Sequence, residues 1–118
     1  MDNLLQGNTG RIDVGSLPPL VRRAVRRFHA AFQPECILIY GSFAKGNFQA
    51  GSDIDILIVA GQSVNPALQQ RRARQLSSDC FPPLDVVFAT PEEVKARDLA
   101  KTPFICTILE KAVVVDFT

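Results

Sequence analysis

The sequence has little of the material that several protein classes require. It contains no tryptophan, one tyrosine, one histidine and three cysteines, and its formal net charge is only +1. Cys36, Cys80 and Cys106 are widely separated and form no C-x-x-C pair, so they do not indicate zinc or redox chemistry. Each has apolar neighbours, and we expect all three to be reduced structural residues.

A membrane segment and a leader peptide are also missing. Residues 1–7 lack a basic segment followed by an apolar one, and no apolar run approaches the roughly 18 residues that span a bilayer. We therefore expect a cytoplasmic protein without membrane contact. The near-neutral charge gives no overall attraction to a polyanion, so a nucleic-acid partner is not supported. The sequence leaves open whether the protein forms a homo-oligomer.

What is present favours one globular domain over residues 1–118. The chain is 47% hydrophobic and 21% charged, which suffices for a hydrophobic core. We place that core at about residues 16–117. Residues 1–15 contain three glycines and little periodicity, so we expect a loosely held arm that includes a short strand at Arg11 to Val14.

The first half of the chain predicts one helix and two strands. Ser16 is a candidate helix cap, and apolar residues recur at helical spacing to about Phe32, before Pro34. A short apolar run at residues 36–40 predicts a buried strand. The strongest strand signal covers residues 53–60, where alternation gives way to a fully apolar run.

The second half predicts three more helices and two more strands. Asn65 or Ser63 can cap a helix that runs to about Asp79. Residues 84–89 form a strand pattern, and Thr90 followed by Pro91 and two glutamates has the features of a capped helix start. A last helix at residues 103–110 and a strand at residues 112–117 complete the pattern.

Asp53 and Asp55 are the first candidate site residues. Side chains two apart on a strand share a face, so the two carboxylates lie together while Ile54 and Ile56 point into the core. Like charges repel unless a cation neutralises them, and Mg²⁺ prefers one or two carboxylates with water and phosphate oxygens. A D-x-D triplet alone is weak evidence, because solvated acids are common at strand starts.

The segment before this pair strengthens the magnesium interpretation. A buried strand ends at Gly41-Ser42, where glycine allows close approach of the backbone to a ligand and the serine hydroxyl can bond a phosphate oxygen. Amides of a helical turn after this point would also attract an anion. Phosphate and metal sites would then be neighbours, as binding of a metal-chelated triphosphate requires.

Gly41-Ser42, ten intervening residues and Asp53-x-Asp55 resemble the signature of the nucleotidyltransferase superfamily typified by DNA polymerase beta. Residues 37–60 are most similar to the minimal nucleotidyltransferases of prokaryotes, which include antitoxins encoded beside HEPN-domain toxins. The resemblance implies an α/β (α+β) nucleotidyltransferase fold, with a small mixed sheet flanked by helices. Lys45 stands where many relatives carry arginine, which keeps the charge but loses the bidentate fork.

The resemblance also implies a ligand set and its cofactors. Family members use a third carboxylate on the next strand, which Asp85 matches, with Asp79 as the alternative. Asp53, Asp55 and Asp85 would be catalytic residues that hold two Mg²⁺ ions, with Mn²⁺ as a substitute. Nucleotide binding would fall to four further residues with ATP as co-substrate: Gly41, Ser42, Lys45 and Ser52.

Other polar and aromatic residues have less specific interpretations. Seven arginines gather on the two predicted helices, and we interpret them as a solvated face or as a surface for an acidic partner or RNA. We expect His29 at the surface or the edge of the core. Tyr40 and Phe48 suit either base stacking or core packing. The arginines are Arg22, Arg23, Arg26, Arg27, Arg71, Arg72 and Arg74.

Two function hypotheses remain. The first is an enzyme that transfers AMP to a hydroxyl on a partner, such as a HEPN toxin in a toxin–antitoxin pair, in the manner of a protein adenylyltransferase. The second is a non-enzymatic interaction protein that neutralises its partner by binding. The set of three acidic residues favours the enzyme, since a binding module has no reason to keep like charges together. Modification of a small molecule is a further alternative.

Overall fold

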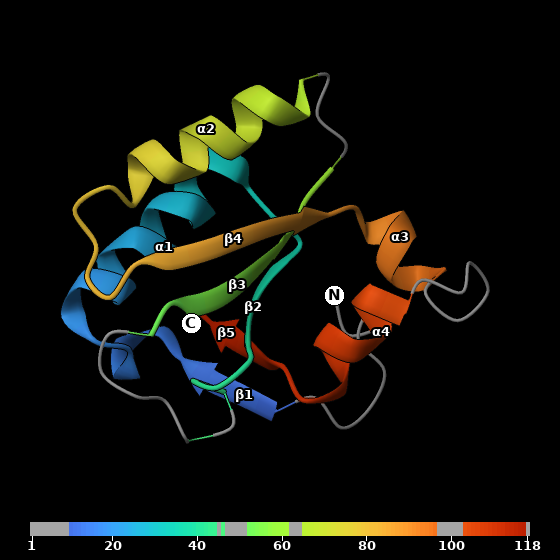
Figure 1. The fold of residues 1–118 in the computed structure, drawn as a ribbon, viewed down its shortest axis with the longest axis horizontal. Helices are drawn as coiled ribbons and strands as arrows, with labels where there is room; N and C mark the ends of the chain where they lie inside the picture. The colour runs from blue at the N-terminus through green and yellow to red at the C-terminus, as the bar shows by residue number, and fades with distance from the viewer. Residues whose placement is uncertain (1–9, 45, 47–51, 62–64, 97–102, 118) are drawn as a thin grey trace.

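The computed structural model describes residues 10–44, 46, 52–61, 65–96 and 103–117. Five strands in these ranges form one mixed sheet in the order β1-β5-β2-β3-β4 (Figure 1). β2 is antiparallel to both its neighbours, whereas β1 with β5 and β3 with β4 are parallel pairs. The predicted mixed sheet is confirmed. The strands are β1 (Gly10–Asp13), β2 (Cys36–Tyr40), β3 (Ile54–Val59), β4 (Leu84–Ala89) and β5 (Val113–Asp116).

The helices cover the two faces of this sheet. α1 (Pro19–Phe32) and α2 (Pro66–Leu76) pack on one face, and α3 (Pro91–Lys95) and α4 (Pro103–Glu110) pack on the other (Figure 1). A short 3-10 helix, η1 (Val14–Ser16), joins β1 to α1. The result is three layers with the buried strands β2 and β3 in the middle layer.

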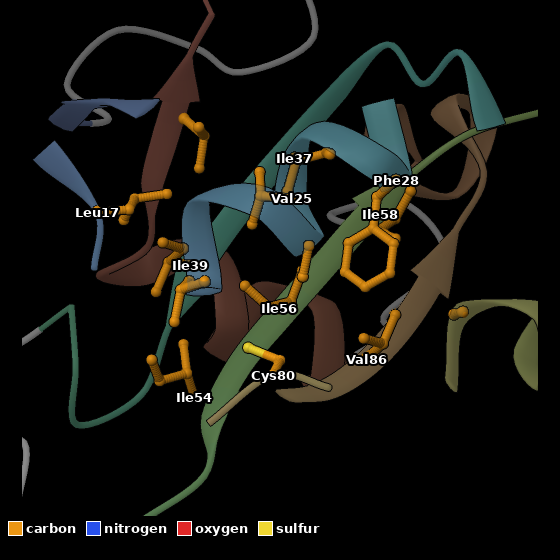
Figure 2. Packing of buried hydrophobic residues seen from close by; sticks show 14 of the residues in the cluster. Leu17, Val25, Phe28, Ile37, Ile39, Ile54, Ile56, Ile58, Cys80 and Val86 are labelled. Carbon is orange, nitrogen blue, oxygen red and sulfur yellow. The ribbon is translucent and has the colours of Figure 1, made fainter. Parts of the chain in front are cut away.

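Alternation along β2 and β3 divides the core into two clusters. Ile37, Ile39 and the isoleucines of β3 lie in the cluster that Phe28 of α1 completes, as Figure 2 shows. Leu38, Leu57 and Val59 lie in the cluster under α3 and α4. Both clusters are buried, which explains why these strands are apolar on successive residues rather than alternating.

The start of α1 differs from the prediction. The helix begins at Pro19, with Pro18 as its cap residue and no capping side chain, while Ser16 belongs to η1. Asp13 caps η1, since its carboxylate accepts from the Gly15 amide at 3.3 Å. Pro18 and Pro19 carry no backbone N–H, so this helix start has fewer amides for a serine to satisfy.

The end of α2 also differs. The helix stops at Leu76, and the hydroxyl of Ser77 donates to the carbonyl of Ala73 at 2.9 Å. Serines at this position compete for the last carbonyls of a helix and favour termination. Its start is as predicted, with the Asn65 side chain accepting from the Leu68 amide, while Ser63 lies outside the described residues.

The short strand expected within the N-terminal arm is present one residue earlier than predicted, and the described part of the arm is held more firmly than expected. Gly10–Asp13 forms the edge strand β1 and pairs in parallel with β5, and Val14 is buried in the core. Of the cysteines, Cys36 and Cys80 are free and buried, and the side chain of Cys106 lies outside the description. None of the helices in the described ranges has the length and apolar character to cross a membrane.

Candidate functional site

Three polar side chains lie in one row across the sheet. Tyr40 on β2 pairs with Asp55 on β3, and Asp55 pairs with Asp85 on β4. Residues paired in this way across adjacent strands present their side chains on the same face. The row therefore brings two carboxylates and a phenol together where β3 and β4 begin and β2 ends.

The row belongs to the sheet face that α3 and α4 cover. Tyr40 and Val87 pack against the cluster beneath those helices, and Asp55 is two residues before Leu57 of the same cluster. Ile54 and Ile56 point to the opposite face and are fully buried, as the sequence predicted. Burial of these isoleucines on one face thus fixes the direction of the Asp55 carboxylate on the other.

Asp53 lies one residue before β3 rather than on it, and it is exposed. The Ile54 amide donates to the Pro83 carbonyl at 2.9 Å, which extends the β3–β4 pairing to the residue beside Asp53. The charge of Asp53 contributes, after burial and Asp85, to the raised pKa of the Asp55 carboxyl, so Asp53 lies near the row. The sequence placed it on the strand, where only Asp55 is found.

Gly41 is required by the packing of this site. It has a φ of +77°, a conformation that side chains disfavour, and a Cβ on it would overlap the Asp55 carboxylate oxygen Oδ2. The absence of a side chain lets the turn after β2 pass directly beside this carboxylate. Gly41 therefore joins the two parts of the sequence motif in space.

The predicted nucleotide-binding residues are only partly described. Ser42 lies in the turn that follows β2, and Ser52 precedes Asp53, both half-buried. Among residues 41–44 and 46 this connection is a turn and not a helix, so the expected helical amides are not observed there. Phe43 and Ala44 pack against the core and anchor the turn. Lys45 and Phe48 lie outside the described residues.

Burial and neighbouring charges raise the pKa of two groups in the row, Asp55 and Tyr40. Burial, then the charges of Asp85 and Asp53, raises the pKa of Asp55 above its ordinary value. Burial and the charges of Asp55 and Asp85 raise the pKa of Tyr40 to about 12. The charges of Asp85 and Asp53 therefore oppose ionisation of Asp55, and a bound cation would relieve that repulsion.

The donor chemistry of the row suits a hard cation such as Mg²⁺, which takes oxygen ligands. Within the described ranges, no three side chains of His, Cys, Asp or Glu are arranged as a ready metal-binding group. Mg²⁺ needs only one or two carboxylates when water and phosphate oxygens complete its octahedron. The residues thus fit a metal that arrives with a triphosphate, whose oxygens would complete its coordination.

Asp79, the alternative third carboxylate, has a different role. It accepts from Arg23 at 2.5 Å and from Arg27 at 3.0 Å, and Arg27 also donates to the Leu76 carbonyl at 3.0 Å. Desolvation raises the pKa of the Asp79 carboxyl, but the Arg27 hydrogen bond and the two arginine charges outweigh it and leave the pKa below its usual value. Asp79 fastens α1 to the segment after α2.

Two features of the site region had little sequence signal. Tyr40 was assigned equally to stacking or packing, and only its register with Asp55 places it in the row. Phe81 is 67% exposed in the segment before β4, close in sequence to Pro83, which pairs with Ile54. His29, in contrast, lies on the surface as expected and stacks on Phe117, with ring centroids 4.1 Å apart.

The comparisons with known proteins concern the fold and the family. Comparison with curated proteins found no match. A chain of the solved structure described as "Crystal structure of the toxin-antitoxin with AMP-PNP" is similar in fold, with a TM-score of 0.51 and 16% sequence identity over 71% of this chain and 88% of that one. Residues 25–111, which contain the whole row, match the family described as "Polymerase beta, Nucleotidyltransferase". The chain therefore belongs to the polymerase beta nucleotidyltransferase family.

Proposed function

We propose that this protein uses Mg²⁺ to transfer AMP from ATP to a hydroxyl group on a partner protein. The observation that carries the proposal is the register of β2, β3 and β4, which sets Asp55 beside Asp85 and against Gly41 in a member of this family. A triphosphate at the Gly41-Ser42 turn would lie next to the carboxylates that hold its metal.

The residues divide the chemistry as follows. Asp53, Asp55 and Asp85 would hold two Mg²⁺ ions, which supply charge neutralisation on the phosphates and a lowered pKa for the acceptor hydroxyl. Ser42 and the amides of the turn would orient the terminal phosphates. The acceptor oxygen forms a bond to the α-phosphorus as the α–β bridging P–O bond breaks, and pyrophosphate leaves. Asp85, which is exposed, can receive the hydroxyl proton and pass it to solvent.

The choice of ATP as the donor and of a protein as the acceptor has its own support. AMP-PNP, named for the solved structure of similar fold, is an analogue of ATP, and that structure is described as a toxin–antitoxin. The carboxylates of Asp53 and Asp85 are exposed, so a protein surface could reach them. A HEPN-type toxin encoded beside this protein is the acceptor we propose, modified on a side-chain hydroxyl such as that of tyrosine.

Calorimetry with ATP tests the metal part. We expect saturable binding with Mg²⁺ or Mn²⁺ and none in EDTA, because the acidic row repels a bare triphosphate. Asp55→Asn should abolish metal-dependent binding and leave the melting temperature equal or higher. Equal ATP affinity with and without metal would remove the metal role, and a large drop in melting temperature would make Asp55 structural.

The sign of that stability effect follows from the raised pKa of Asp55. The native state binds the proton more tightly than the unfolded chain, so ionisation destabilises the fold as pH rises above the ordinary carboxyl value of about 4. Asp55→Asn should therefore raise the melting temperature at neutral pH and leave it unchanged in acid, where Asp55 is protonated. Melting curves of both proteins across this pH range measure it.

Intact mass spectrometry tests the acceptor. Incubation with the neighbouring gene product, ATP and Mg²⁺ should add AMP units to that partner, and Asp85→Ala should abolish the addition. The matched control is Asp79→Ala, which removes an acid outside the row. A partner that binds but never gains mass, without ATP consumption, would favour neutralisation by binding alone.

A further inference from the structure

A shallow groove runs along the outer side of α1, away from the sheet. Its volume is about 600 Å³. Three of the lining residues are apolar, Pro19, Leu20 and Ala30, and the other four are arginines. Leu20 is 37% exposed, one of the few large apolar side chains exposed in the described part of the chain. The groove thus has an apolar floor with cationic sides.

The four arginines are not equivalent. Arg23 and Arg27 share the Asp79 carboxylate, and Arg22 donates to the Gly15 carbonyl at 3.1 Å. Arg26 is exposed, and the contacts described for residues 10–44, 46, 52–61, 65–96 and 103–117 include no acid for it. Arg22 and Arg26 are also four residues apart, a like-charged spacing that disfavours the isolated helix. Within the described residues, Asp79 thus pairs with two of the four cations along this side of α1, and the contacts given there show no acid for the other two.

The backbone of α1 limits what can lie in this groove. Its N–H and C=O groups are used within the helix, so the groove offers few backbone partners to an extended peptide, whose own backbone groups would lose water. A helix satisfies its own backbone and can place apolar side chains on the floor, with acidic ones beside the arginines. The lined segment, from Pro19 to Ala30, has a length of about 16 Å, which matches about three turns of a partner helix.

The same surface suits RNA less well. Affinity for nucleic acid grows with the number of phosphates that cations neutralise, and two of the four arginines already hold a carboxylate. The residues that line the groove include no aromatic side chain on which a base can stack. An apolar floor also gains from a hydrophobic partner and not from a sugar–phosphate backbone.

We propose that the α1 groove is the docking site for an acidic amphipathic helix of a partner protein. The proposal deepens the proposed function, on which it rests for the partner's role as acceptor. Binding at this site needs neither ATP nor metal, so it can be measured apart from AMP transfer. Asp79 pairs with Arg23 and Arg27 of the groove, and the segment that contains Asp79 leads into β4, the strand that carries Asp85.

Fluorescence anisotropy with three labelled probes tests the docking site. The first is a peptide of about 18 residues with leucines at helical spacing and glutamates flanking them, the second has the same composition in an order without an apolar stripe, and the third is an oligouridylate of similar length. We expect the patterned peptide to bind at least about tenfold more tightly than either of the others. Binding should weaken with added salt.

Matched variants locate the interaction. Arg26→Glu should weaken binding of the patterned peptide by about tenfold, and Leu20→Ser by severalfold, while Lys95→Glu, an equal charge change on exposed α3, should change it less than about twofold. Melting curves check the fold, and Arg26→Gln serves if Arg26→Glu does not fold. Tighter binding of the RNA, equal effects of Arg26→Glu and Lys95→Glu, or no saturable binding of the patterned peptide would each overturn the proposal. None of these outcomes would alter metal-dependent ATP binding.

Discussion

Tyr40 lies at the edge of the carboxylate row, where its protonation state determines the charge beside Asp55. Burial and two neighbouring acids raise the pKa of its phenol to about 12, so the side chain is neutral at physiological pH. A neutral phenol beside Asp55 adds no further negative charge at the site where a triphosphate is expected. It can therefore stay close to phosphates or a base without repulsion.

The sequence makes this pKa measurable without any label. Tyr40 is the only tyrosine and there is no tryptophan, so tyrosinate absorbance reports this one group. We expect a midpoint near pH 12 in the native protein and near 10 in denaturant. Since the native state holds the proton more tightly, stability from this group is complete below pH 10 and is lost as pH rises toward 12. Asp55→Asn should lower the native midpoint; a native midpoint of 10 would contradict the arrangement.

Gly41 is the second residue whose identity the site demands. Gly41→Ala combines a disfavoured positive φ with an overlap on the Asp55 carboxylate, so it should both destabilise the fold and abolish metal-dependent ATP binding. Gly46→Ala separates the two effects, because Gly46 has a φ of +80° but no atom within 4 Å of an added Cβ.

Denaturant unfolding compares these glycine variants. Gly46→Ala should cost about 1 kcal/mol for the backbone conformation, and Gly41→Ala should cost more. Gly61→Ala, with neither a positive φ nor a close atom, should be nearly neutral. If Gly41→Ala loses no more stability than Gly46→Ala and still binds ATP in a metal-dependent way, the turn does not pack against Asp55 as described.

At the scale of elements, the contact between α1 and the segment after α2 distinguishes the two candidates for the third carboxylate, Asp79 and Asp85. Asp79 holds Arg23 and Arg27, while Asp85 pairs in register with Asp55. Asp79→Asn should lower stability and leave AMP transfer intact. Asp85→Asn should abolish AMP transfer without lowering stability. Transfer assays and melting curves on both variants distinguish them. Loss of transfer in Asp79→Asn alone would show that Asp79, and not Asp85, is the third carboxylate.

The pH dependence of this contact follows from the lowered pKa of Asp79. The native state releases the proton more readily than the unfolded chain, so the contribution is present above the ordinary carboxyl value of about 4 and is lost as pH falls through the native pKa. Asp79→Asn should therefore differ from the parent protein at neutral pH and converge with it in acid. High salt should reduce the difference, because the pair is exposed.

Local sequence signals predicted most elements because they depend on neighbours along the chain. The apolar run at residues 36–40 and the pattern at residues 84–89 match β2 and β4, and Thr90 and Glu93 form the capping box that opens α3. Helix ends were less predictable where side chains compete with the backbone. Ser16 and Ser77 show this, the first displaced by two prolines and the second ending α2 early.

At the scale of the whole molecule, pairings between distant segments were outside the reach of sequence patterns. Gly10–Asp13 pairs with a strand about a hundred residues later, so the sequence indicated a short strand there but not the partner that holds it in the sheet. The approach of Gly41 to Asp55 and of Asp79 to α1 also depends on the assembled fold. Asp55 was predictable from the alternation on β3 and Asp85 from the family resemblance, although the register that aligns them with Tyr40 was not predictable.

The whole molecule places its two proposed binding surfaces on different layers. The carboxylate row belongs to the sheet face under α3 and α4, and the arginine groove lies on the outside of α1. The segment that contains Asp79 joins α2 to β4 and contacts α1, so the two surfaces are connected through one short stretch of chain. This arrangement allows a docked partner and a bound nucleotide to occupy the protein together.

Anomalous diffraction from a crystal grown with ATP and Mn²⁺ is the most direct test of the central claim, that the acidic row holds a metal-bound triphosphate. We predict manganese peaks between the carboxylates of Asp53, Asp55 and Asp85, with the triphosphate along the Gly41-Ser42 turn. Asp55→Asn in the same conditions should lose the peaks. Manganese or ATP bound elsewhere, with no peak beside Asp55 and Asp85, would contradict the account.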